Sequence, residues 1–276
     1  MIKSEKIEAL FGQALEGDKP QLFFDAIERA SGLPGPRPNL DLLRAIGDRL
    51  ASAWSSGGED LTAALFERDR QALTYCGLMA LAARAEAGQR AALAELVEAS
   101  DETHKEKRAA VTDALERGLS SEAGARHIDA FVTLAIEGGY PDDGRADTLT
   151  RRAVADKIRD AAPLTNLFEA ALLASDDAPR SADRLQGLRL LREALPRAMA
   201  RAVARFPRET LALVERALTS ERPETRVALA ELLGLLRKEL REAEVDKLRA
   251  TFEANEKPRR DAARKVQGTR KRSRGR

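Results

Sequence analysis

Apolar side chains recur along most of the chain with the period of an amphipathic α-helix. The clearest segment is residues 224–240, whose apolar stripe consists of Leu229, Leu232, Leu233, Leu236 and Leu240. Positions three, four and seven apart share one face of a 3.6-residue helix, so this spacing predicts a helix with one buried side. Pro223 suits the first turn, where its missing N–H is no loss, and Glu224 favours the positive end of the helix dipole.

Short polar stretches rich in proline and glycine interrupt this pattern. We expect loops at residues 33–39, 55–58, 138–144 and 175–181. Prolines fix φ and remove a backbone donor, so single prolines also mark helix boundaries. In the second half of the chain such boundaries are expected at Pro163, Pro196, Pro207 and Pro223.

The composition supports the same fold class. Charged residues make up 33% of the 276 residues and hydrophobic residues 43%, whereas aromatic residues make up only 4%. Alanine, leucine, arginine and glutamate lose little side-chain freedom in a helix, and the β-branched and aromatic residues that favour strands are scarce. The sequence therefore predicts an all-α protein.

One stretch, residues 217–236, indicates an internal repeat. A leucine-ended helix is followed by a short polar turn, by Arg226 near the start of the next helix, and by an Ala/Leu stripe. Weaker copies contain Arg70, Arg108, Arg152 and Arg184. The five arginines are 38, 44, 32 and 42 residues apart, close to the roughly 40–47 residues of HEAT and armadillo repeats.

This unit resembles a HEAT repeat, and the resemblance covers about residues 60–256. HEAT families commonly open the second helix with Val-Arg, whereas this chain has Thr225-Arg226. The resemblance implies a right-handed stack of antiparallel helix pairs, a HEAT-like α-solenoid. In such an array each repeat buries its apolar stripe only against its neighbours. We expect an N-terminal helical cap at 1–56, a helical-repeat body at 57–256 and a basic disordered tail at 257–276.

Charge is distributed unevenly along the chain. The tail has one acidic residue, Asp261, and ten basic residues: Lys257, Arg259, Arg260, Arg264, Lys265, Arg270, Lys271, Arg272, Arg274 and Arg276. Its net charge is +9, whereas the other 256 residues carry −7. The tail has too few apolar residues to offset the entropy of ordering, and its cations can neutralise phosphates. Sequence-independent contact with DNA or RNA is one interpretation; a solubilising tail, or one that folds back on the acidic body, is the alternative.

The residues that usually carry catalysis or bind metals are sparse. Cys76 is the one cysteine and lies in an apolar helical pattern, so we interpret it as a buried core residue. His104 and His127, the two histidines, each lie at or beside an expected helix start and form no ligand-spaced pair. Trp54 is the one tryptophan, and we expect it to pack where the Pro-rich loop meets the first helices. No nucleotide-binding or hydrolase motif occurs, so we assign no catalytic residue, metal or cofactor.

These observations favour a non-enzymatic scaffold or adaptor. It would bind a protein partner in the solenoid groove, while the tail adds weak contact with nucleic acid. The N-terminus does not have the pattern of a signal peptide, and no apolar run is long enough to span a bilayer. We therefore expect a cytoplasmic protein with no membrane partner. The alternative is a HEAT-like DNA-repair glycosylase acting on alkylated bases. Such an enzyme would bring an aromatic residue, an arginine and a carboxylate together in one concave groove.

Overall fold

All secondary structure in the part of the chain that the structure describes is helical, which confirms the predicted all-α class. The computed structural model describes residues 4–99, 105–137 and 152–255. The first half comprises α1 (Ser4–Leu15), α2 (Pro20–Ser31), α3 (Leu40–Ser52), η1 (Trp54–Ser56), α4 (Gly58–Glu67), α5 (Gln71–Glu86), α6 (Arg90–Ala99), α7 (Lys105–Ser120), α8 (Glu122–Ala125) and α9 (Ile128–Glu137). The second half comprises α11 (Arg152–Ala155), α12 (Ala162–Asp177), η2 (Arg180–Arg184), α13 (Gln186–Arg205), α14 (Pro207–Ala217), α15 (Pro223–Leu236) and α16 (Glu242–Ala254).

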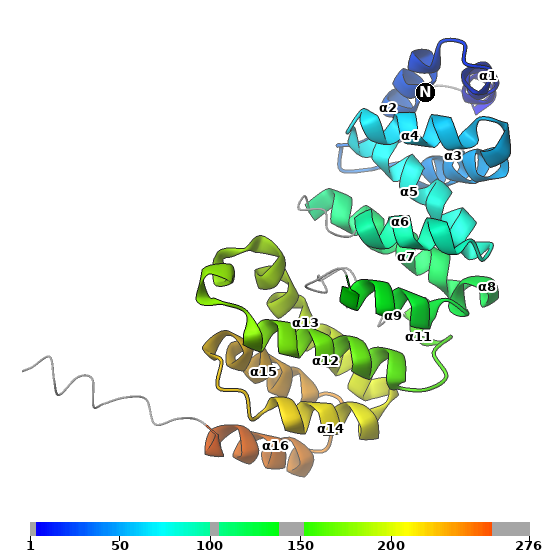
Figure 1. Ribbon diagram of the computed structural model, residues 1–276. Helices are drawn as coiled ribbons and strands as arrows, with labels where there is room; N and C mark the ends of the chain where they lie inside the picture. Colours follow the sequence, from blue (N-terminus) through cyan, green and yellow to red (C-terminus); the bar gives the residue numbers. More distant parts are fainter. Residues whose placement is uncertain (1–3, 100–104, 138–151, 256–276) are drawn as a thin grey trace, which may run out of the picture.

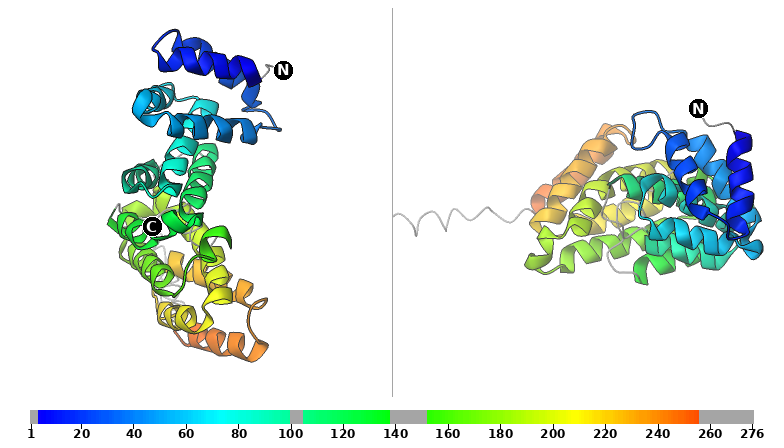
Figure 2. Two further views of the ribbon diagram at one scale, coloured as in Figure 1. Left: turned by 90° about the vertical axis from the view of Figure 1, so that its right-hand side faces the viewer. Right: turned by 90° about the horizontal axis from the view of Figure 1, so that it is seen from above.

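The helices lie side by side in an elongated body that is two helices thick (Figures 1 and 2). In one series α6 packs on α9, α9 on α12, and α12 on α14. In the other, α3 packs on α5, α5 on α7, and α13 on α15. We call α6, α9, α12, α14 and α16 the front layer, as seen in Figure 1, and α5, α7, α13 and α15 the back layer.

Proline or a polar cap begins several of these helices, and for α12, α14 and α15 the proline is one predicted to mark a helix boundary. Proline occupies the first turn of α2, α12, α14 and α15, where no backbone donor is lost from the helix. The side chain of Asn39 accepts a hydrogen bond from the N–H of Leu42 and caps α3. Gly57 precedes α4 with φ of 96°, a conformation that glycine adopts without a steric penalty. The break expected at residues 33–39 is confirmed, whereas the one expected at 55–58 lies at residues 53–57 and contains η1, because α3 ends at Ser52 and α4 begins at Gly58.

Three predicted boundaries are wrong. Pro196 does not separate two helices but lies buried inside α13, where its neighbours Leu195 and Ala198 pack into the core and offset the lost backbone hydrogen bond. Helix α12 extends through residues 175–177, which were predicted as loop. Helix α15 ends at Leu236, so Leu240 packs against the core from outside the helix, although the other four leucines of its stripe are buried as predicted.

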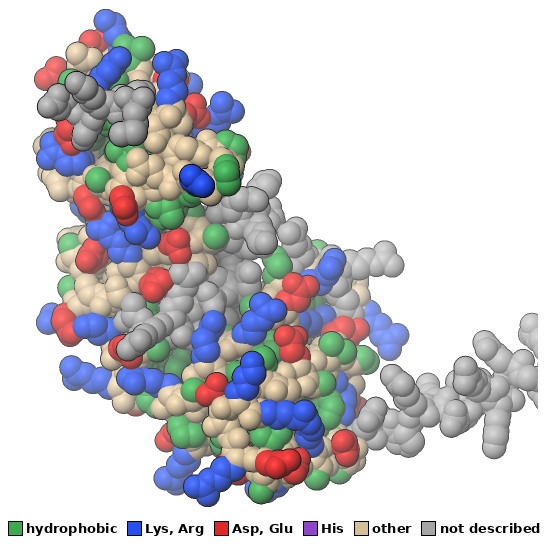
Figure 3. Space-filling view, turned by 180° about the vertical axis from the view of Figure 1, so that it is seen from behind, with side chains coloured by type: hydrophobic (Ala, Val, Ile, Leu, Met, Phe, Trp, Pro, Cys, Tyr) green, Lys and Arg blue, Asp and Glu red, His purple; other side chains and the backbone are tan. Residues whose placement is uncertain are grey.

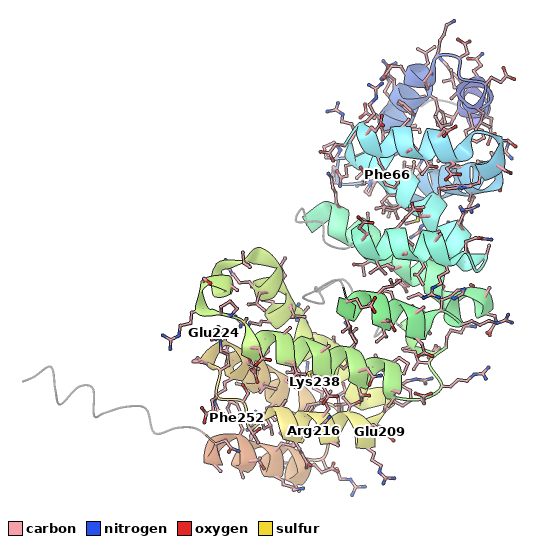
Figure 4. All side chains as sticks on the ribbon, viewed as in Figure 1. Phe66, Glu209, Arg216, Glu224, Lys238 and Phe252 are labelled. Atoms are coloured by element: carbon pink, nitrogen blue, oxygen red, sulfur yellow. The ribbon has the colours of Figure 1, made fainter. Side chains whose placement is uncertain are left out.

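Helix α5 lies at the centre of the first half and is buried on almost every side. Small residues let its neighbours approach closely: a Cβ atom at Gly47 of α3 would lie 2.5 Å from Cβ of Met79. A Cβ at Gly77 would lie 2.7 Å from the ring of Phe66, which lies between α4 and α5 (Figure 4). Cys76 is fully buried in this helix, and burial raises the pKa of its thiol, which confirms its interpretation as a core residue.

The second half is joined by buried polar groups as well as by leucine. The guanidinium of Arg192 in α13 donates to Oγ of Ser175 at 2.9 Å and to the carbonyl oxygen of Ser175 at 2.8 Å, near the C-terminus of α12. Oγ of Ser175 lies 2.7 Å from Oγ1 of Thr225 in α15. All three side chains are buried, and they connect α12, α13 and α15. This network explains why α12 continues through Ser175, since Arg192 satisfies a carbonyl that the helix end leaves unpaired.

Some predictions fall on residues that the structure does not describe: the loop at 138–144, His104 and the basic tail. Among the described helices, none combines the length and the low charge needed to cross a membrane.

Candidate binding surfaces

The tail predicted to bind nucleic acid lies outside the described residues, but the structure shows how the helix before it is held. Helix α16 ends at Ala254, and the guanidinium of Arg226 donates to the carbonyl oxygen of Phe252 at 2.9 Å. The same guanidinium lies 4.0 Å from the centroid of the Phe252 ring, at the end of α16 labelled in Figure 4. Arg226, which the repeat pattern singled out, therefore fixes the helix that precedes the tail.

A row of arginines on α13 forms a basic surface in the described body. The exposed side of this helix carries Arg189, Glu193, Arg197, Arg201 and Arg205, which follow one another at intervals of four residues. On its opposite side Leu188, Leu191 and Leu195 are buried in the core. That buried stripe fixes the rotation of the helix, so the arginines face away from the core. We call Arg189, Arg197, Arg201 and Arg205 the α13 arginine row.

Neighbouring acids lie at the limit of ion-pair distance from this row. Nε of Arg197 is 4.0 Å from Oε1 of Glu231 in α15, and the Arg197 side chain is 70% exposed. Nη1 of Arg205 is 3.9 Å from Oδ1 of Asp156, and its Nη2 reaches the carbonyl oxygen of Ile158 at 3.5 Å. Such exposed pairs hold a guanidinium weakly. Figure 3, seen from behind, shows Lys and Arg side chains spread over the lower half of the molecule with fewer acids between them.

The α13 arginine row was not predicted from the sequence, although the repeated interval of four is visible there. The body as a whole has a negative net charge, and this total conceals a basic strip on one helix. The sequence also places Arg192 among the four arginines, and only its burial shows that it belongs to the core.

An arginine of the back layer in the first half is paired to two acids. Arg117 of α7 reaches across α5: its Nη2 donates to Oδ1 of Asp48 in α3 at 2.5 Å, and its Nε donates to Oε2 of Glu86 in α5 at 3.0 Å. Burial raises the pKa of Tyr75 in α5, an effect that the guanidinium of Arg44 opposes. Arg117 thus joins α7 to α3 and α5 through short ion pairs, whereas the ion pairs of the α13 arginine row are long.

Trp54 has an arginine over its ring. The guanidinium of Arg84 in α5 lies 4.3 Å from the ring centroid, and the half-buried indole packs against the core. Glu59 of α4 and Glu95 of α6 carry charge close to this pair: burial raises the pKa of Glu95, Glu59 and Glu98 raise it further, and Arg84 lowers it. Trp54, Arg84 and Glu95 are of the three residue types sought for the enzymatic alternative, but they line neither of the two hollows described below. In addition, Arg84 covers one face of the indole.

The hollows in the surface are polar and of mixed charge. One of about 620 Å³ lies between the start of α9 and the segment before α12, with Glu122, Arg126, Asp129 and Lys157 in its walls. Lys157 is ion-paired to Glu122 across it. Another, of about 560 Å³, lies beside Asp176, Arg180 and Glu224. Within the described residues no group of His, Cys, Asp and Glu is arranged to hold a metal ion, and Nε2 of His127 is 3.1 Å from the carbonyl oxygen of Gly88.

Comparison with known proteins gives no family. The chain matches no protein-family model, and no curated protein or solved structure is detectably similar to it. The geometry of the chain itself is therefore the guide to its function.

The position of Glu95 near Glu59 and Glu98 leads to a prediction about the pH dependence of stability. The raised pKa of Glu95 means that the folded state binds its proton more tightly than the unfolded state does. Its contribution to stability is present at low pH and is lost as pH rises through the folded pKa. Glu95→Gln should therefore raise the free energy of unfolding at neutral pH by a few tenths of a kcal/mol, the size of a like-charge repulsion on a helical surface.

Urea denaturation of both proteins between pH 4 and pH 8 measures this effect. The gain should be largest at pH 8 and shrink as the carboxyl of Glu95 becomes protonated. Glu239→Gln, in the exposed turn after α15, is the control. A pH-independent gain, or equal gains in both variants, would refute a repulsion at Glu95.

Proposed function

We propose that the protein is a non-enzymatic helical-repeat scaffold, a HEAT-like right-handed α-solenoid of antiparallel helix pairs. It binds a protein partner along the groove side of the stack, and its basic tail adds weak, sequence-independent contact with DNA or RNA. The observation that carries the proposal is the serial packing of helices in two layers: α6 on α9, α9 on α12 and α12 on α14 in the front layer, and α5 on α7 and α13 on α15 in the back layer.

Three features support a scaffold rather than an enclosed catalytic site. First, serial packing presents a long surface instead of one deep pocket, as extended repeat proteins do when they bind other chains. Second, the hollows of the described body are polar and open, whereas small-molecule sites are concave and mostly apolar. Third, the back layer offers exposed apolar and charged groups together, since Val227 of α15 is 71% exposed and belongs to the same layer as the α13 arginine row.

The nucleic-acid part of the proposal is tested by neutralising the tail. The full chain and a variant with the ten tail Lys and Arg residues replaced by Gln are titrated against labelled duplex DNA and single-stranded RNA over a salt series. Each phosphate neutralised by the tail should add about 0.9 to the slope of log K against log salt on duplex DNA and about 0.7 on a single strand. We expect the wild-type slope to be steep and the variant slope to be clearly shallower. Equal slopes would show that the tail binds no phosphate.

A substitution on the back layer tests the proposal that the chain binds a protein partner. A partner captured by the wild-type chain should be released by Val227→Asp, which places a charge on the back layer without entering the core. A partner retained equally by both chains does not bind at Val227, and a binding groove on the back layer would then be wrong.

The second candidate function, a glycosylase acting on alkylated bases, is favoured by one observation, the grouping of Trp54, Arg84 and Glu95. Incubating the protein with a duplex that contains alkylated bases decides it. Release of free base by the wild type, lost in Glu95→Gln, would establish the enzyme and displace the scaffold proposal.

A further inference from the structure

The α13 arginine row is regular enough to act as one surface. An interval of four residues advances each position by about 6 Å along the helix axis and by about 40° around it, so the row from Arg189 to Arg205 crosses the exposed face diagonally over about 24 Å. The four cations share the exposed side of the helix with one acid, Glu193. All four cations are arginines, whose planar guanidinium binds phosphate oxygens through two parallel hydrogen bonds.

The row is presented on a rigid support. Helix α13 buries Leu188, Leu191 and Leu195 on its core side, and Arg192 ties it to α12. At the far end of the row, Arg205 is held near Asp156 and Ile158. A preformed row loses less entropy on binding than cations on a flexible segment do.

The ion pairs of Arg197 and Arg205 are long enough for a ligand to displace them. The acids beside Arg197 and Arg205 stand 4.0 Å and 3.9 Å away. Exposed pairs of this kind contribute little to stability, so a polyanion can replace them at little cost.

The chemistry of the row selects among polyanions. Base stacking on single strands needs aromatic side chains, and α13 has none. Double-stranded RNA is recognised mostly by shape and by contacts to 2′-hydroxyl groups and phosphates across its wide minor groove, whereas the cations of the row are all arginines, which favour paired contacts to phosphate oxygens. A duplex carries one phosphate charge per about 1.7 Å of its axis, so about 24 Å of DNA offers many more phosphates than the row has cations.

We propose that the α13 arginine row is a binding site for the phosphate backbone of duplex DNA. The site lies in the folded body and does not depend on the tail, to which the proposed function assigns nucleic-acid contact. Because the row reads only backbone charge, it fixes how the stack lies on the duplex and carries no sequence preference.

The test replaces Arg189, Arg197 and Arg201 by Gln in the full chain. Arg205 is kept because it also bonds the Ile158 carbonyl. The matched control replaces three exposed arginines of the front layer, Arg90 of α6 and Arg208 and Arg216 of α14, so both variants lose the same net charge. Binding of a short labelled duplex DNA is measured by fluorescence anisotropy over a salt series, with circular dichroism confirming that each variant is folded.

We expect the row variant to bind duplex DNA at least about tenfold more weakly near 0.1 M salt, and to lower the salt slope by about two to three, because each phosphate contact contributes about 0.9 to that slope. The control variant should stay within about twofold of the wild type. If both variants lose DNA binding equally, the effect comes from net charge alone and the row is not a specific site. Tighter binding of single-stranded RNA, double-stranded RNA or polyglutamate than of duplex DNA would also overturn it.

A second pair of proteins separates this site from the tail. In a chain whose tail cations are all replaced by Gln, the row substitutions should still weaken the remaining DNA binding by a similar factor. If they have no effect there while the tail substitutions abolish binding, the row is not a site and the tail proposal stands. If the row substitutions weaken DNA binding while the tail substitutions have no effect, the row is the site and the proposal for the tail is wrong.

Discussion

Gly47→Ala should lower the free energy of unfolding by about 3 kcal/mol, the upper part of the range for adding a methyl group to a filled core. The new Cβ would stand 2.5 Å from Cβ of Met79 and under 3 Å from the backbone of Met79 and Ala80. Backbone atoms cannot turn aside as the end of a side chain can, so α3 and α5 must move apart. The shape of the first half depends on this contact, because α5 lies at its centre.

A second helical glycine gives the matched control. A Cβ atom added at Gly234 of α15 would have nothing within 4 Å, so Gly234→Ala should raise the free energy of unfolding by about 0.5–1 kcal/mol through helix propensity alone. Urea denaturation followed by circular dichroism measures both. A Gly47→Ala protein as stable as the wild type would show that α3 and α5 are not in backbone contact.

Arg192→Ala should cost about 3 kcal/mol, because it removes charge-assisted hydrogen bonds and leaves a buried hydroxyl and a buried carbonyl of Ser175 with fewer partners. Arg192 is 8% exposed, so water cannot replace the lost donors. Arg192→Met, which keeps most of the aliphatic volume, separates the hydrogen bonds from packing and should recover only part of the loss.

Arg197→Ala, five residues along the same helix, is the control. That side chain is 70% exposed and its ion pair is 4.0 Å long, so the change should stay within about 0.5 kcal/mol. Thermal unfolding of the three variants gives the comparison. Equal effects of Arg192→Ala and Arg197→Ala would mean that the network among α12, α13 and α15 adds nothing to stability.

The pattern of hydrophobic positions could be interpreted in advance wherever burial is local to one helix. The stripe of Leu229, Leu232, Leu233 and Leu236 was predicted from spacing and is buried. The buried position of Cys76 followed from its apolar neighbours in the same way. The helix ends were harder: Ser175 and Pro196 were assigned to breaks because such residues usually mark them, and long-range contacts outweighed that preference.

The candidate binding surface could be predicted only in part. The interval of four that links Arg189, Arg197, Arg201 and Arg205 is in the sequence, but it drifts by about 40° around the helix at each step. Arg192 falls on the stripe of Leu188 and Leu195, and only the structure shows which group, Ser175, its buried side chain meets. The difference depends on which other helix lies against each side of α13.

By itself, the sequence determined that this chain is helical, where α12, α14 and α15 begin, and which leucines of α15 face inward, because helix propensity, proline and 3.6-residue periodicity act within a few neighbouring residues. The tertiary structure alone decided that Gly47 touches Met79, that Arg192 is a core residue, and that Trp54 lies under Arg84. Each of these contacts joins helical segments that are separate in the chain. Which residues meet therefore depends on the packing of the whole stack, which no local pattern specifies.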